Sequence, residues 1–290
     1  MKHILESARN EAVVCLGDSI TYGMRKEWGS ATWRPLKLSL MCSRQHWKYD
    51  PRGRLPLLLF ICGGGFTHVD ANVWMPELAY YAKRGYAVAS IEYSTTGGTV
   101  FPAQVEDIRE GIRFLQAHAD EFRLDMSRCA IMGESAGAYL AGCIAFIDGG
   151  GQSGVFTAPA CKTGVNSAGS AQAVPTYAHD AEAALKAAIL LYPPVALDKL
   201  PANPIIDTIM KGAPDLASLV TPSAPPIFLA HGTNDNLVPC SQSEYLYDAL
   251  EKNHVKNEFY LIKDCDHADS PVFQSSVKEL ICQFLAENVR

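Results

Sequence analysis

The sequence predicts an α/β fold in which a mostly parallel central sheet carries helices on both faces. Short apolar runs of strand length alternate with longer segments of helical character, and this alternation is typical of a parallel sheet. The chain has 290 residues, of which 48% are hydrophobic, which is enough for a substantial core. No internal repeat is visible, and length alone is compatible with one large domain or two small ones.

The apolar pattern of each segment justifies the element expected there. In the helix over 103–118, apolar residues recur every three or four positions and form one stripe, made of Val105, Ile108, Ile112 and Leu115. The helix over 73–84 ends at Gly85. The strands are short apolar runs, expected at 36–42, 55–62, 86–92, 128–132, 187–192, 226–231 and 258–262. The helices are expected at 73–84, 103–118, 138–145, 241–252 and 272–287.

Residues 1–35 are expected to form an N-terminal arm or strand that leads into the sheet, and residues 36–290 the main domain. Two segments of that domain interrupt the alternation. Residues 148–180 are rich in Gly, Ser and Ala and predict a long loop. Residues 193–226 contain many prolines and some apolar residues, which predicts a short cap.

Composition excludes several classes of partner. The net charge is −6 and no Lys/Arg cluster stands out, so nucleic acid is not an expected partner. No apolar run reaches membrane-spanning length, and residues 1–11 lack the apolar region of a signal peptide. The nine cysteines form no C-x-x-C pair or zinc spacing, which favours free thiols in a reducing cytoplasm and indicates no metal site. A homo-oligomer is compatible with the sequence.

The most informative motif is Gly133-Glu134-Ser135-Ala136-Gly137, which reads G-x-S-x-G between an apolar run and a helix. A serine on a sharp strand-to-helix turn has a strained backbone, and the flanking glycines relieve the clash and leave the hydroxyl exposed. We therefore expect Ser135 to be a nucleophile. Taken alone, the pattern also fits an ordinary Gly/Ser turn, so the rest of the chain has to decide.

A nucleophilic serine needs an oxyanion hole, and the segment Cys62-Gly63-Gly64-Gly65-Phe66 follows an apolar strand. Consecutive glycines at a strand end allow backbone N–H groups to converge on one developing charge. A flexible turn or a phosphate-binding loop are the alternatives, although no G-K-[ST] follows. The elbow is expected to add the N–H of Ala136.

The nucleophile also needs a base and an orienting carboxylate. Asp235 follows the strand over 226–231, and His267 follows the strand over 258–262. The order Ser135, Asp235, His267 matches a known chain order of the catalytic triad. His231 is expected to be a structural hydrogen-bonding residue. The competing carboxylates lie close to His267 in sequence, which makes them harder to place opposite its ring: Asp264, Asp266 and Asp269.

These four ordered motifs resemble those of α/β-hydrolases of the esterase and lipase group, which includes hormone-sensitive-lipase-like, acetylxylan-esterase-like and feruloyl-esterase-like members. The resemblance covers about 36–290. It implies an α/β-hydrolase fold, Gly64 and Gly65 as oxyanion donors beside Ala136, and no metal or organic cofactor. Cys62 replaces the family's histidine, which normally braces the glycine turn, but the oxyanion donors are backbone groups.

A second resemblance competes with the first. The segment Gly17-Asp18-Ser19-Ile20 is similar to the first block of SGNH/GDSL hydrolases, which would make Ser19 the nucleophile. Two further blocks of that family resemble 232–235 and 264–267. We disfavour this interpretation because Asp235 and His267 are too close in sequence for that family, and because it leaves the glycine triplet and the elbow unexplained.

The favoured function is a serine carboxylesterase acting on short-chain acyl esters, acetyl esters in the first place, of small molecules or of oligosaccharides from plant polysaccharides. A short cap without a large apolar lid argues against long-chain lipids. The alternatives are a lipase, a feruloyl esterase, a prolyl-oligopeptidase-type peptidase and a non-catalytic binding protein. Phe66, Glu134 and Phe101 are expected to contact the substrate, with core packing as the alternative for the aromatic residues.

Overall fold

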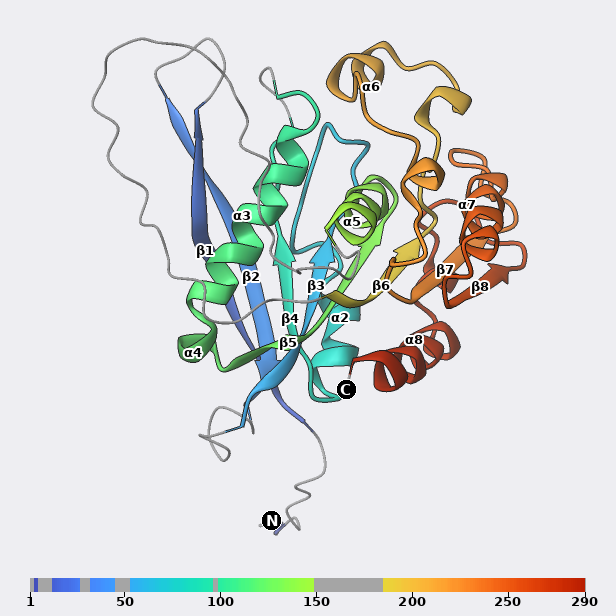
Figure 1. Ribbon diagram of the computed structural model, residues 1–290. Helices are drawn as coiled ribbons and strands as arrows, with labels where there is room; N and C mark the ends of the chain where they lie inside the picture. The colour runs from blue at the N-terminus through green and yellow to red at the C-terminus, as the bar shows by residue number, and fades with distance from the viewer. Residues whose placement is uncertain are drawn as a thin grey trace.

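The computed structural model describes residues 3–4, 12–26, 32–44, 53–95, 99–148 and 185–289. An eight-stranded sheet forms its centre, with the strand order β1-β2-β4-β3-β5-β6-β7-β8 (Figure 1). The pairs β1–β2 and β2–β4 are antiparallel, and the other pairs are parallel. The mostly parallel sheet predicted from the sequence is confirmed, and its antiparallel part lies at the edge that β1 forms.

The apolar runs form the expected strands. β5 starts before the predicted 128 because Leu124 and Asp125 already pair with Leu55 and Pro56, ahead of an irregularity in the register. The strands are β1 (Val14–Lys26), β2 (Trp33–Ser43), β3 (Leu55–Ile61), β4 (Ala87–Ile91), β5 (Leu124–Glu134), β6 (Leu185–Leu191), β7 (Ile227–Gly232) and β8 (Asn257–Ile262).

The predicted helices are also present. The last one begins later than the predicted 272, because a 3₁₀ turn, η3 (Ser270–Phe273), comes first. The helices are α2 (Met75–Ala82), α3 (Ala103–Ala117), α4 (Ala119–Phe122), α5 (Ala136–Ile147), α6 (Pro204–Ile209), α7 (Ser241–Lys252) and α8 (Ser275–Asn288). Within the described ranges, no helix has both the length and the apolar character that crossing a bilayer requires.

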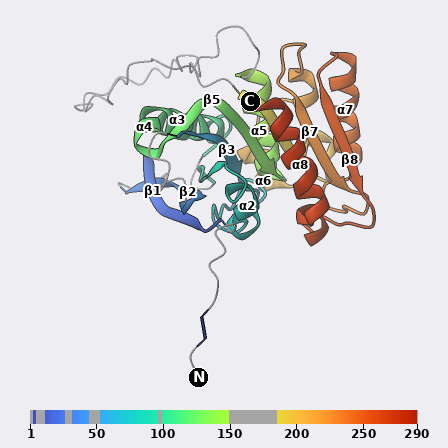
Figure 2. The ribbon, with the colours of Figure 1, turned by 90° about the horizontal axis from the view of Figure 1, so that it is seen from below.

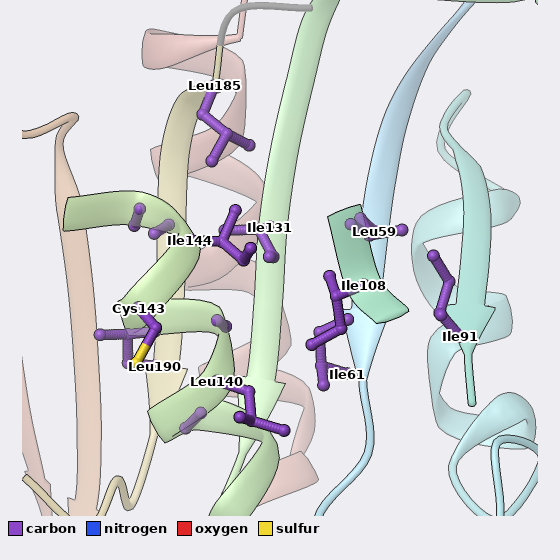
Figure 3. Packing of buried hydrophobic residues seen from close by; sticks show 14 of the residues in the cluster. Leu59, Ile61, Ile91, Ile108, Ile131, Leu140, Cys143, Ile144, Leu185 and Leu190 are labelled. Atoms are coloured by element: carbon purple, nitrogen blue, oxygen red, sulfur yellow. The ribbon is translucent and has the colours of Figure 1, made fainter. Parts of the chain in front are cut away.

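The core lies on both faces of the sheet, since its central strands are buried on both sides. In β3, Leu57, Leu59 and Ile61 belong to one apolar cluster, and Leu58 and Phe60 belong to the other. The first cluster includes residues of α3, α5 and α7, and the second includes residues of α2 and α8 (Figure 2). Figure 3 shows the first cluster, with side chains of β3, β5, α3 and α5 packed together. Each such leucine or isoleucine contributes about 1.5–3 kcal/mol by leaving water.

The segment predicted as a cap lies between β6 and β7 and contains η1 (Leu197–Lys199), α6 and η2 (Leu216–Leu219). α6 lies beyond the carboxyl ends of the parallel strands (Figure 1). Several hydrogen bonds join this segment to the body, among them those from the Val195 and Ala196 N–H groups to Gln242 Oε1. Two others come from the elements before it in the chain. The Phe101 N–H donates to Ile209 O at 2.7 Å, and the Tyr139 hydroxyl donates to Pro214 O at 2.6 Å. The long loop predicted over 148–180 lies outside the described residues from 149 onward.

Candidate active site

The turn between β5 and α5 holds Ser135 in a conformation that few residues adopt, with φ 52° and ψ −126°. A Cβ added to Gly133 would lie 2.4 Å from Gly137 O, and one added to Gly137 would lie 2.1 Å from Ile61 O. Both contacts are with backbone, which cannot move aside as a flexible side chain does. The two glycines are therefore required by the close approach of α5 to β3 and β5, as expected for a nucleophile elbow.

The structure brings together the three side chains that the sequence predicts as a triad. Ser135 Oγ lies 2.9 Å from His267 Nε2, and His267 Nδ1 lies 2.7 Å from Asp235 Oδ2. Ser135 follows β5, Asp235 follows β7 and His267 follows β8, so all three stand at the carboxyl edge of the sheet. With Nδ1 donating to the carboxylate, Nε2 is free to accept the proton of the serine hydroxyl.

The environment of Asp235 keeps it ionised. Its carboxyl group is buried, and burial alone would raise its pKa. Hydrogen bonds from His231, His267 and the Val238 N–H outweigh burial and hold the pKa of Asp235 well below its ordinary value. The other oxygen, Oδ1, accepts from the N–H groups of Leu237 and Val238 at 3.0 and 2.8 Å. The site therefore has a fixed negative charge behind the imidazole.

The neighbouring carboxylates have other partners. Asp266 accepts from the backbone N–H groups of His267 and Asn236 and so joins the two loops that carry His267 and Asp235. Asp269 caps η3 through the Ser270 N–H. Among the described residues, the imidazole of His267 is hydrogen-bonded to Asp235 and to none of these carboxylates.

His231 is fully buried, as expected for a structural residue, and it lies beside Asp235. Its Nδ1 is 2.7 Å from Ser243 Oγ, and its Nε2 is 2.8 Å from Val238 O. The same Nε2 is 3.3 Å from Asp235 Oδ2. Asp235 thus lies between two imidazoles, and His231 helps to hold the carboxylate in place.

The glycine loop after β3 makes a tight turn that requires glycine. Gly64 and Gly65 have φ of 128° and 58°, and a Cβ on Gly64 would lie 2.1 Å from His68 O. The N–H groups of Thr67 and His68 both donate to Gly64 O, which closes the turn. Within the described part of the chain, no hydrogen bond uses the N–H of Gly64, Gly65 or Ala136.

The three residues predicted to contact substrate differ in exposure and in the groups that they contact. Phe66 is 2% exposed and packs edge-on against Tyr139, with ring centroids 5.7 Å apart. Glu134 is 4% exposed and faces the glycine loop. Both side chains are thus buried against other parts of the protein. Phe101 is half-buried, and its N–H donates to Ile209 O in the cap segment.

Sequence reasoning missed the roles of two aromatic residues. Trp74 donates from Nε1 to Glu134 Oε1 at 3.2 Å and stacks on Phe273. The Tyr192 ring lies 4.9 Å from the His267 ring, nearly perpendicular to it. Tyr192 directly follows β6 and Trp74 directly precedes α2, and neither position distinguishes core packing from support of a site.

Ser19, the alternative nucleophile, lies inside β1, where the register shifts between Gly17 and Ile20. Its hydroxyl is 3.4 Å from Asp18 Oδ2. Since His267 is hydrogen-bonded to Ser135 instead, and since the strand order is that of another fold, the structure disagrees with the SGNH interpretation.

Known proteins share this architecture. A truncated carbohydrate esterase from gut microbiota superposes with a TM-score of 0.71 at 17% identity, covering 97% of this chain and 98% of the other. The carboxylesterase Cest-2923 from Lactobacillus plantarum superposes with a TM-score of 0.69 at 18% identity, covering 91% and 96%. At such identities the likeness concerns the fold, and it confirms the α/β-hydrolase fold.

Curated relatives agree with this placement. A probable isoprenylcysteine alpha-carbonyl methylesterase of Oryza sativa is 27% identical over 76% of this chain and 52% of its own length. The probable carboxylic ester hydrolase LipM of Mycobacterium tuberculosis is 26% identical over 70% and 46%. This chain spans about half the length of these relatives. The BD-FAE family model matches residues 47–250, which is more than half of the chain. The protein belongs to the BD-FAE family, within the esterase group of the α/β-hydrolases.

Proposed function

We propose that this protein is a serine carboxylesterase with Ser135, His267 and Asp235 as its catalytic triad. The observation that carries the proposal is the continuous chain from Ser135 Oγ to His267 Nε2 and from Nδ1 to Asp235 Oδ2, at 2.9 and 2.7 Å. The esterase names of the family's relatives support the same reaction class.

In the proposed mechanism, His267 Nε2 takes the hydroxyl proton as Ser135 Oγ attacks the ester carbonyl carbon. The carbonyl oxygen becomes an oxyanion and accepts hydrogen bonds from the N–H groups of Gly64, Gly65 and Ala136. Each such donor contributes about 3 kcal/mol to the transition state. His267 then gives its proton to the departing alcohol and leaves an acyl group on Ser135.

Water resolves the acyl-enzyme by the same route in reverse. His267 takes a proton from the water, the resulting hydroxide attacks the acyl carbon, and Ser135 leaves as its alcohol after regaining the proton. Asp235 stabilises the imidazolium in both halves of the cycle, because its carboxylate stays charged next to Nδ1. The chemistry proposed here uses only groups of the chain and water.

For the substrate, we propose short acyl esters, with acetyl groups on small molecules or oligosaccharides as the first choice. A short cap with a single helix of six residues, α6, supports a small acyl group. The carbohydrate esterase among the structural neighbours makes an oligosaccharide a reasonable alcohol part. A cytoplasmic setting is compatible with the eight described cysteines, all of which are free thiols.

The test is a substrate panel on the purified protein. We expect hydrolysis of p-nitrophenyl acetate to exceed that of the octanoate by at least about 10-fold in kcat/KM, since a poorly fitted chain loses binding energy in the transition state. Acetylated xylo-oligosaccharides and methyl ferulate separate an acetyl esterase from a feruloyl esterase. Preference for octanoate would point to a lipase, and absence of turnover on every ester would contradict the proposed activity.

A further inference from the structure

Glu134 is a buried acidic residue that the mechanism above does not use. It directly precedes Ser135, at the end of β5, and its side chain points to the glycine loop instead of the substrate side. Its Oε1 accepts hydrogen bonds from the Gly63 N–H and from Trp74 Nε1. The Cys62 thiol lies 3.6 Å from the same oxygen. One buried carboxyl oxygen thus collects three donors around the start of the loop.

The fit between Glu134 and the loop is tight. A Cβ added to Gly63 would lie 2.6 and 2.8 Å from the two carboxyl oxygens, so the carboxyl group rests directly on the backbone of this glycine. Burial, followed by the charge of Glu134, raises the pKa of the Cys62 thiol far above its ordinary value. The thiol therefore keeps its proton and can donate it to Glu134.

Further hydrogen bonds hold the loop. The Tyr93 hydroxyl donates to Cys62 O at 3.0 Å, and the N–H groups of Thr67 and His68 close the turn on Gly64 O. These contacts fix the carbonyl groups of the loop. The Gly63 N–H belongs to the same peptide unit as Cys62 O, and its acceptor is Glu134. This unit directly precedes the Gly63–Gly64 peptide, which carries the Gly64 N–H.

We propose that Glu134 is the positioning residue of the oxyanion hole: it locks the glycine loop to the strand that carries Ser135. Because Glu134 and Ser135 are consecutive, the oxyanion donors and the nucleophile are set on one rigid frame. The inference rests on the proposed function, since it assigns Gly64 and Gly65 as donors. It also accounts for Cys62, which replaces the family's histidine. In this chain the Glu134 carboxyl group braces the glycine turn in place of that histidine.

The expected effect lies in the transition state, where the oxyanion exists. Misplacing a catalytic group by about 1 Å costs on the order of 10²-fold in rate. We expect Glu134→Ala to lower kcat about 10²-fold while KM changes less than about threefold. Glu134→Gln keeps a carbonyl oxygen for the Gly63 N–H, so we expect it to retain kcat within about 10-fold. Trp74→Phe removes one donor but keeps a ring on Phe273, and we expect a loss of about threefold.

The experiment measures kcat and KM for p-nitrophenyl acetate, and separately the rate at which a fluorophosphonate labels Ser135. In labelling, Ser135 Oγ bonds to phosphorus, His267 takes the hydroxyl proton and fluoride leaves, while the phosphoryl oxygen occupies the oxyanion hole. The matched control is Glu77→Ala, which removes a carboxylate from the neighbouring helix α2, where it pairs with Lys278. The free energy of unfolding is measured for every variant.

Slower labelling and lower kcat in Glu134→Ala, with recovery in Glu134→Gln and no change in Glu77→Ala, support the inference. Equal rates in Glu134→Ala and Glu77→Ala overturn it, as does an effect confined to KM. If Glu134→Ala does not fold, the inference is overturned instead by a Glu134→Gln variant whose kcat is about 10²-fold below that of the wild type. If the wild type hydrolyses no ester, the proposed function fails, while slower labelling of Glu134→Ala still supports the positioning role.

Discussion

Two serines of this chain share a local pattern and differ in what surrounds them. Gly17-Asp18-Ser19 and Gly133-Glu134-Ser135 both place an acidic residue between a glycine and a serine, and both serines have positive φ, 58° and 52°. In the first, the Asp18 carboxyl group accepts from Ser39 and Asn72. In the second, the Glu134 carboxyl group accepts from the glycine loop and Trp74. Similar triplets thus serve two different purposes.

The difference lies in the strand that carries each serine. Ser19 is inside an antiparallel edge strand, and its strained backbone coincides with a shift of register, as in a β-bulge. Ser135 ends a parallel strand and starts a helix, so its hydroxyl lies where loops from other parallel strands also end. A strained serine becomes a candidate nucleophile only when the fold delivers a base to the same edge.

The largest expected effect separates the two serines directly. Ser135→Ala should lower kcat/KM for p-nitrophenyl acetate by about 10⁴–10⁶-fold, because no covalent intermediate can form. Ser19→Ala should stay within about twofold of wild type. Initial rates on both variants measure this, and an active Ser135→Ala protein beside an inactive Ser19→Ala protein would reverse the assignment.

Asp235→Asn should have the next largest effect, a loss of about 10⁴-fold in kcat, because the amide no longer holds the imidazole in the required tautomer. Asp266→Asn is its control, since the Asp266 carboxyl group accepts from the backbone N–H groups of Asn236 and His267. We expect the control to keep kcat within about 10-fold. Steady-state kinetics on both variants decide the matter, and equal losses would show that Asp266 shares the role of Asp235.

Replacing the glycine of each triplet should change the stability of the protein by different amounts. A Cβ on Gly133 meets backbone at 2.4 Å, whereas one on Gly17 meets Ile20 Cδ1 at an ordinary 3.6 Å. We expect Gly133→Ala to lower the free energy of unfolding by about 3 kcal/mol or more, and Gly17→Ala to change it by less than about 1 kcal/mol. Urea unfolding measures both, and a fully stable Gly133→Ala protein would contradict the packing described for the elbow.

The smallest effect concerns acid stability at Asp18. Hydrogen bonds from Ser39, Asn72 and Ser19 lower its pKa to about 2. Because this pKa lies below that of an unfolded aspartate, about 3.9, the ionised carboxylate stabilises the fold at pH values above about 3.9. The contribution is lost as the pH falls toward 2. The difference in unfolding free energy between wild type and Asp18→Asn should be constant above pH about 5 and shrink between pH about 4 and 2. A difference that grows in that window would contradict the assigned shift.

The fold was largely predictable because its determinants are local. Apolar runs such as 55–62 and the stripe of the helix over 103–118 identify their elements without tertiary information. The elbow and the order of Ser135, Asp235 and His267 were predictable for the same reason, since chain order and strand ends are visible in a sequence.

What escaped prediction depends on the direction in which side chains point after folding. Glu134 and Phe66 were expected at the substrate side and lie buried, because the packing of β3 against α5 decides their orientation. The bond from Trp74 to Glu134 joins residues that no sequence pattern connects. His231 and Asp235 are four positions apart, but the contact between their side chains depends on how the loop after β7 folds.

The hydrogen bond from the Phe101 N–H to Ile209 O has a consequence for mutations in the cap segment. It links the end of α6 to the turn ahead of α3, so these two parts of the chain separate only if the bond breaks. A substitution in α6 that displaces Ile209 is therefore expected to disturb the start of α3 as well, although the two lie about a hundred positions apart in the sequence.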